Sequence, residues 1–65
     1  MIQIIPTSTH TTITMPQDLF RQLETNVRPI ATYIDDNTTY VYISLSNPEF
    51  AEFEAFLTRE RILPL

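Results

Sequence analysis

The stretch that decides the fold spans residues 11–23 and reads TTITMPQDLFRQL. Up to Met15 its apolar residues alternate, as they do in a strand with one buried face. Beyond Pro16 they have helical spacing, at Leu19, Phe20 and Leu23. The fixed φ and missing N–H of Pro16 suit the first turn of a helix and not a central strand position. The stretch therefore predicts a strand that runs directly into a short helix.

The short helix is expected between Pro16 and Glu24. Thr14 and Gln17 have the spacing of a capping box, in which a hydroxyl and an amide side chain satisfy free backbone N–H groups. Residues 25–29 are expected to form a connector, because Pro29 cannot continue a helix and biases the residue before it to extended backbone.

A β-hairpin is predicted on each side of this helix. The first pairs a strand at Ile2–Ile5 with a strand at His10–Met15, around a turn rich in Thr, Ser and Pro. The second pairs Ile30–Ile34 with Thr39–Leu45 around the turn Asp35–Thr38, whose Asp and Asn residues tolerate positive φ. The chain is therefore predicted to be α+β.

The side chains of the second hairpin predict its register. If Ile34 opposes Thr39, one face of the hairpin is mainly aliphatic and the other collects Tyr33, Tyr40 and Tyr42. A slip of one residue would mix the two sets. We expect the aliphatic face to be core. Because tyrosine rings favour burial and their hydroxyls need a partner, we expect the tyrosine face to be half-covered.

A second, amphipathic helix is predicted from the capping-box pair Ser46 and Glu49 to about Arg61. Its apolar stripe is expected to pack on the sheet, and the alternative is a helix that lies in the groove of a partner. The stripe consists of Phe50, Phe53 and Leu57. The candidate partner-binding residues are the apolar side chains beside the stripe and in the tail. These residues are Phe56, Ile62, Leu63 and Leu65.

The length of the chain, 65 residues, limits it to a single domain with a small core. It has no Cys, so no disulfide can add to its stability. Because such a core is marginal for a lone chain, we expect a homodimer with a shared sheet. The side chains expected to contribute to that sheet are Ile2, Ile4, Ile13, Val41 and Ile43.

The formal net charge of −4 and the absence of Lys argue against a nucleic-acid partner. Nucleic-acid binding depends on basic side chains that displace counterions from phosphates. Arg21 and Arg28 are the candidate contacts if nucleic acid is bound. The sequence also shows no membrane-spanning stretch, and the apolar run at residues 1–5 has no basic flank typical of a signal peptide. A cytoplasmic protein is expected.

No residue pattern typical of a catalytic or cofactor site is present. His10 is the only histidine, and Cys, Lys and Gly are absent, so nothing marks an activated nucleophile or a phosphate-binding loop. Asp35 and Asp36 can be interpreted as a metal pair, but adjacent carboxylates in such a turn ordinarily serve the turn. We predict no enzyme activity, no cofactor, no metal and no small-molecule substrate.

The order of these elements resembles the AbrB/MazE swapped-hairpin family. The resemblance covers Ile2 to Leu45, with the corner Thr14-Met15-Pro16, a helix carrying Leu19 and Leu23, and a hairpin turning at Asp35-Asp36. It implies two interleaved chains in a small dimeric barrel or sheet, with a swapped-hairpin part at 1–45. The C-terminal helix and tail at 46–65 lie outside the resemblance. Family members are regulators or antitoxins that bind DNA through the first hairpin, and antitoxins wrap a toxin with a C-terminal tail.

The chain departs from the family pattern where the family binds DNA. Thr11-Thr12 stand in place of the usual Gly-Arg, and Ile5 and Pro6 replace basic residues of the first strand. A ribbon–helix–helix repressor also begins with a strand, a proline and a helix. That alternative fails because residues 30–45 have a two-residue period and not helical spacing.

We therefore predict a small non-enzymatic protein that binds another macromolecule, antitoxin-like or transcription-regulator-like. The alternative is an acidic inhibitor or accessory protein, for example of phage type, that binds a protein partner and not DNA. The charges around Arg21 and Arg28 discriminate between the two, because surrounding carboxylates would exclude a DNA contact there.

Overall fold

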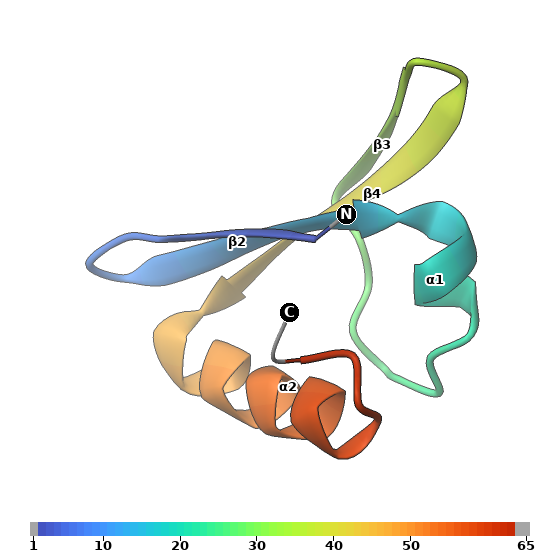
Figure 1. Cartoon of the computed structure of the whole chain (residues 1–65). Helices are drawn as coiled ribbons and strands as arrows, with labels where there is room; N and C mark the ends of the chain where they lie inside the picture. The colour runs from blue at the N-terminus through green and yellow to red at the C-terminus, as the bar shows by residue number, and fades with distance from the viewer. Residues whose placement is uncertain (1, 64–65) are drawn as a thin grey trace.

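The computed structural model describes residues 2–63. This range forms one antiparallel sheet with two helices (Figure 1). The strands are β1 (Gln3–Pro6), β2 (His10–Pro16), β3 (Ala31–Asp35) and β4 (Thr38–Ser46), and the helices are α1 (Gln17–Arg21) and α2 (Asn47–Arg59). The predicted α+β class and the order of two hairpins around a short helix are confirmed.

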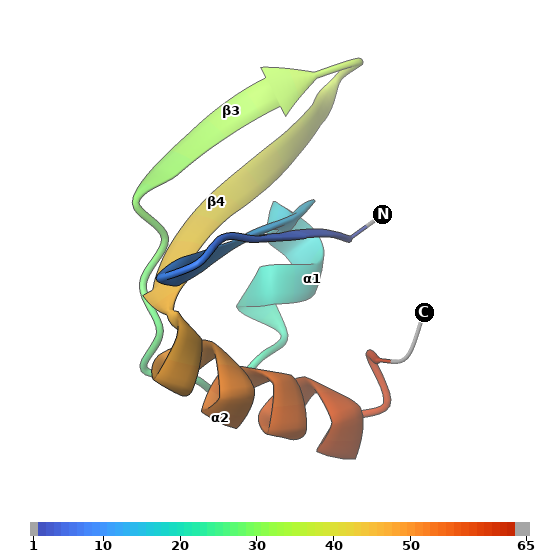
Figure 2. The same ribbon diagram turned by 90° about the vertical axis from the view of Figure 1, so that its left-hand side faces the viewer.

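Strands β2 and β4 join the two hairpins into a single sheet of order β1-β2-β4-β3. They pair along all of β2, from His10 opposite Ser46 to Pro16 opposite Tyr40. Strands β1 and β3 are the edges of the sheet. Both helices lie on the same side of the sheet, and α2 runs below β2 and β4 (Figure 2).

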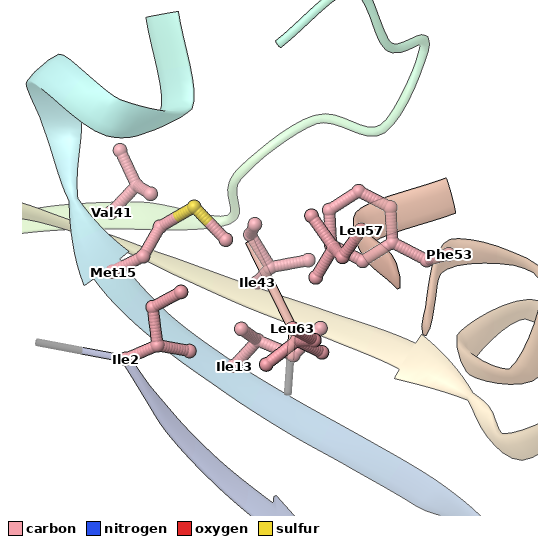
Figure 3. Packing of buried hydrophobic residues seen from close by; sticks show 8 residues of the cluster. All are labelled: Ile2, Ile13, Met15, Val41, Ile43, Phe53, Leu57 and Leu63. Atoms are coloured by element: carbon pink, nitrogen blue, oxygen red, sulfur yellow. The ribbon is translucent and has the colours of Figure 1, made fainter. Parts of the chain in front are cut away.

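The core lies between that side of the sheet and α2. Alternation along the central strands directs Ile13 and Met15 from β2, and Val41 and Ile43 from β4, toward the helices, and each of these side chains is at most 2% exposed. The remaining buried apolar side chains are Ile2, Phe53, Leu57 and Leu63 (Figure 3). The predicted packing of the α2 stripe on the sheet is thus confirmed for Phe53 and Leu57.

The residues expected to form a sheet shared by two chains lie within one chain's own core. Ile2, Ile13, Val41 and Ile43 are buried there, and Ile4 packs against them. The core of a single chain accounts for these side chains without a second copy.

Helix α1 is shorter than the predicted range and lacks the predicted cap. It starts after Pro16, and no side chain caps its first turn. Thr14 remains within β2, opposite Tyr42, so the Thr14–Gln17 capping box is wrong. The N–H groups of Gln22 and Leu23, directly after the helix, donate to carbonyls three residues back, and this tighter 3₁₀-type turn ends the α-helix at Arg21.

The second hairpin has the predicted register, with Ile34 opposite Thr39. Its turn consists of two residues, Asp36 and Asn37, whose φ values of 51° and 63° are the left-handed geometry of a two-residue hairpin turn. The expectation that its aliphatic face is core is wrong for both isoleucines of the predicted strand 30–34. Ile30 lies just before β3 and is 64% exposed. Ile34 is 74% exposed, because the tip of the hairpin extends beyond both helices (Figure 1).

We expect Ile43→Ala to lower the free energy of unfolding by about 2–5 kcal/mol, since it removes fully buried methyl groups from between β4 and α2. Ile5→Ala is the matched control. Ile5 lies in β1 and is 56% exposed, so its loss should change stability by no more than about 0.5 kcal/mol. Urea denaturation followed by circular dichroism measures both. Equal effects of the two substitutions would contradict this core.

Candidate functional site

A groove runs between the connector that follows α1 and the first turns of α2. Its floor is apolar, with Phe53 buried and Val27 and Phe56 half-buried. Its polar lining comes from both segments and is dominated by exposed carboxylates. The polar residues are Glu24, Thr25, Asn26, Glu49 and Glu52. We call this surface the acidic groove.

A local hydrogen bond shapes the connector side of the acidic groove. The N–H of Val27 donates to Oγ1 of Thr25 at 3.1 Å. Such a hydroxyl turn redirects the backbone within two residues. Val27 then packs against the core, and the neighbouring Glu24 and Asn26 stay exposed. The connector therefore presents polar groups at the rim and one apolar side chain at the floor.

Phe56 is the predicted partner contact that lies in the acidic groove. Its ring stacks on that of Phe53, with 6.1 Å between the centroids and 20° between the planes. The guanidinium of Arg59 lies 6.0 Å from the Phe56 centroid, which is within the range of a cation–π contact. These neighbours hold the ring in one place while part of it stays exposed. A fixed, half-exposed aromatic side chain is suited to contact a partner.

Glu49 carries the cap of α2 as well as a charge at the groove. Its Oε1 accepts the Ser46 hydroxyl at 2.7 Å and the Ser46 backbone N–H at 3.1 Å, and its own N–H donates to the Ser46 hydroxyl. The predicted Ser46–Glu49 capping box is confirmed. The side-chain and then the backbone hydrogen bond from Ser46 lower the pKa of Glu49 below 4.5, with a smaller contribution from nearby His10.

The lowered pKa of Glu49 predicts a pH dependence of stability. The contribution of Glu49 is complete above its unfolded-state pKa and is lost as the pH falls through its lower folded-state pKa. In Glu49→Gln, the free energy of unfolding should therefore differ less between neutral pH and about pH 3 than it does in the unmodified protein. Urea denaturation of both proteins at the two pH values measures this. An exposed carboxylate outside the cap, Glu54, supplies the control, because Glu54→Gln should leave the difference unchanged.

The tail after α2 folds back onto the protein. Arg61 has φ 62°, the N–H of Arg61 donates to the Thr58 carbonyl at 3.1 Å, and that of Ile62 donates to the Leu57 carbonyl at 2.9 Å. These two bonds form a Schellman motif, which ends α2 at Arg59, before the predicted Arg61. The motif returns Leu63 to the core.

The predicted tail contacts therefore have different environments. Ile62 is half-buried against the core, and Leu63 is 9% exposed within it. Leu65 lies outside the described residues. Phe56 and Ile62 retain some exposed surface for a partner, whereas the Leu63 side chain is occupied by the protein's own core.

Leu63→Ala should lower the free energy of unfolding by about 2 kcal/mol or more, because the side chain is buried in the core cluster that includes Ile13 (Figure 3). Glu60→Ala is a nearby control on an exposed side chain and should have little effect. Thermal and urea denaturation report the difference. A fully stable Leu63→Ala variant would show that the tail does not belong to the core.

The candidate nucleic-acid contacts, Arg21 and Arg28, are both exposed. Arg21 is the last residue of α1, and Arg28 lies near the end of the connector. Glu24 lies between them in the sequence and belongs to the acidic groove. The segment that joins the two arginines in the sequence therefore contributes a carboxylate to the acidic groove.

The face of the sheet opposite the helices carries the three tyrosines. The rings of Tyr33 and Tyr40 stack with 5.4 Å between their centroids, and Gln3, Thr14 and Asp35 line a shallow hollow with them. Tyr33 is 45% exposed, and Tyr40 and Tyr42 are half-buried. Within residues 2–63 no helix covers this face. The expected partial cover is therefore found for Tyr40 and Tyr42, where side chains and backbone of the sheet provide it, and not for Tyr33.

Of the residues considered for catalysis or metal binding, Asp35 lines the tyrosine hollow, and His10 and Asp36 line neither the hollow nor the acidic groove. His10 is exposed at the start of β2, with Nδ1 3.1 Å from the Thr9 hydroxyl. Asp36 occupies the hairpin turn with positive φ. Within residues 2–63 no three His, Cys, Asp or Glu side chains gather as a metal site would require. No helix among these residues has the length and apolar character needed to cross a bilayer.

The acidic groove was not predicted from the sequence. Glu49, Glu52, Phe53 and Phe56 have the three- and four-residue spacings of one helix face, and this spacing was the available signal. No sequence pattern indicated that residues 24–27 would lie against that face of the helix. Comparison with protein-family models, with curated proteins and with solved structures gives no match to this chain.

Proposed function

We propose that this chain is a small non-enzymatic protein that acts by binding another protein, as antitoxins of the AbrB/MazE type do. The acidic groove is the observation that carries the proposal. It combines an apolar floor containing the fixed ring of Phe56 with a rim of three carboxylates. Such a surface suits recognition, because the apolar floor supplies affinity and the charged rim supplies specificity.

The chemistry of the groove indicates what a partner must present. An apolar side chain would cover Phe56 and Val27, and Arg or Lys beside it would meet Glu24, Glu49 or Glu52. The groove is built largely by α2, which follows the residues that resemble the family, and antitoxins of that family bind their partner through a C-terminal segment. A basic, partly apolar segment of a protein is therefore the proposed occupant.

The same chemistry favours a protein partner over DNA. The carboxylates of the acidic groove repel phosphates, and Glu24 lies on the segment between Arg21 and Arg28. This charge arrangement supports the second candidate, an acidic inhibitor or accessory protein without DNA activity, over a DNA-binding regulator. An antitoxin that binds only its toxin satisfies both descriptions.

Absence of DNA binding is a direct expectation. Fluorescence anisotropy with a labelled random duplex at low salt should show no binding at protein concentrations of about 10⁻⁴–10⁻⁶ M, the range of dissociation constants that is typical of non-specific DNA binding. Submicromolar binding that is lost in Arg21→Ala or Arg28→Ala would instead favour the DNA-binding regulator.

A photo-crosslinking experiment tests the groove itself. A benzophenone amino acid is introduced at Glu52, in the groove, or at Glu54, which is also exposed on α2 but does not line the groove. In the native host, the first position should give an adduct with a specific protein and the second should not. Glu24→Lys in the first background should reduce the adduct a few-fold, because each exposed charge pair contributes about 0.2–1 kcal/mol.

Equal adducts from the two positions would contradict a binding site in the groove. Circular dichroism of each variant shows whether the fold is kept, so that loss of an adduct can be assigned to the surface. An adduct that is insensitive to Glu24→Lys would show that the carboxylate rim does not select the partner.

A further inference from the structure

The two edges of the sheet differ in how well they are protected against pairing. Edge strand β1 has four residues and ends at Pro6, which has no N–H to donate. Edge strand β3 has no proline, all five of its residues are exposed, and its only charged residue is Asp35 at the end. Soluble proteins ordinarily protect such an edge with charge, proline or a covering element. Along residues 31–34 the β3 edge carries neither charge nor proline, and no described element covers it.

The hairpin turn determines which backbone groups face the open side of β3. With the two-residue turn at Asp36 and Asn37, Asp35 and Thr38 form the hydrogen-bonded pair next to the turn. Hydrogen-bonded and non-bonded pairs alternate in an antiparallel ladder, so Tyr33 bonds toward β4. The N–H and C=O groups of Thr32 and Ile34 therefore point to the outer edge.

We propose that the β3 edges of two copies of this chain pair antiparallel around a two-fold axis at Tyr33, joining the two sheets into one. In this register Thr32 of each chain exchanges backbone hydrogen bonds with Ile34 of the other. Tyr33 faces Tyr33 across the axis. The pairing is independent of the acidic groove, which is formed by the connector and α2.

The side chains of β3 fit this symmetric register. Asp35 of one chain faces Ala31 of the other, so no two like charges oppose each other. Ile34, which is 74% exposed in the single chain, gains Thr32 of the second copy as a neighbour on the helix side. On the opposite side, the stacked pair of Tyr33 and Tyr40 meets its symmetry copy and forms a row of four rings.

A second copy fits this edge better than a foreign strand for two reasons. Pairing around a two-fold axis gives hydrogen-bond partners to the outward N–H and C=O groups of both chains in one interface. Symmetric dimers of this kind are the commonest protein assembly. The row of tyrosines is also continuous only when the added strand carries Tyr33 at the axis. Because both copies carry net charge −4, added salt should strengthen the association.

Sedimentation velocity of the full chain at micromolar concentration is expected to show twice the mass of the chain. Thr32→Pro removes the outward N–H and leaves the hydrogen bonds between β3 and β4 in place. The variant should therefore sediment as a monomer and keep the circular dichroism spectrum of the folded protein. Thr32→Val keeps the N–H and should remain dimeric. A monomer for the unmodified chain at hundreds of micromolar would overturn the proposal.

Because the chain has no Cys, single cysteines can locate the axis. Across a non-bonded antiparallel pair the Cα atoms are about 4.5 Å apart, which a disulfide can bridge. Tyr33→Cys should therefore oxidise to a covalent dimer at least about tenfold faster than Ala31→Cys, whose position faces Asp35 of the other chain. Faster crosslinking through Ile5→Cys, on β1, would place the contact on the other edge and overturn the proposal.

Discussion

The pairing of β2 with β4 is the constraint on which the rest of this structure depends. Ile13 stands opposite Ile43 and Met15 opposite Val41, so the pairing brings four nearly inaccessible side chains together on one face. Helix α2 follows directly from β4, and α1 follows directly from β2, so both helices start from this pair. A slip of one residue would move polar Thr12 and Thr14 into the core and the isoleucines to the opposite face.

This constraint also separates the surfaces that are available for function. The core occupies the helix side of the sheet. The acidic groove lies on the surface of the helix layer, between the connector and α2. The opposite side carries Tyr33, Tyr40 and Tyr42, and its open edge is β3. A partner in the groove and a second copy at the edge would therefore occupy separate parts of the molecule.

Local patterns in the sequence predicted much of the fold. The alternation in β4 fixed the register of Ile34 and Thr39, and Ser46 with Glu49 identified the start of α2, because both signals involve residues close in the chain. The errors concern competition between local and distant contacts. Pairing with Tyr42 keeps Thr14 in a strand despite its capping-box spacing, and a Schellman motif returns Leu63 to the core.

The candidate site was less accessible to sequence reasoning. Phe56 was identified from its position beside the apolar stripe, but Glu24 and Val27 approach α2 only through the path of the connector. That path depends on a local hydrogen bond from the Val27 N–H to the Thr25 hydroxyl and on the packing of Val27, and neither has a distinctive sequence pattern. The exposure of Ile34 depends on how far the helices reach along the sheet, which strand periodicity does not encode.

The β2–β4 register is tested most directly by nuclear Overhauser effects between side-chain methyl groups. The structure predicts strong cross-strand effects between Ile13 and Ile43, and further effects from Ile43 to Leu57 on α2. Absence of the Ile13–Ile43 effect, or effects that place Ile13 opposite Tyr42 or Ser44, would contradict the register and with it the separation of the core face from the tyrosine face.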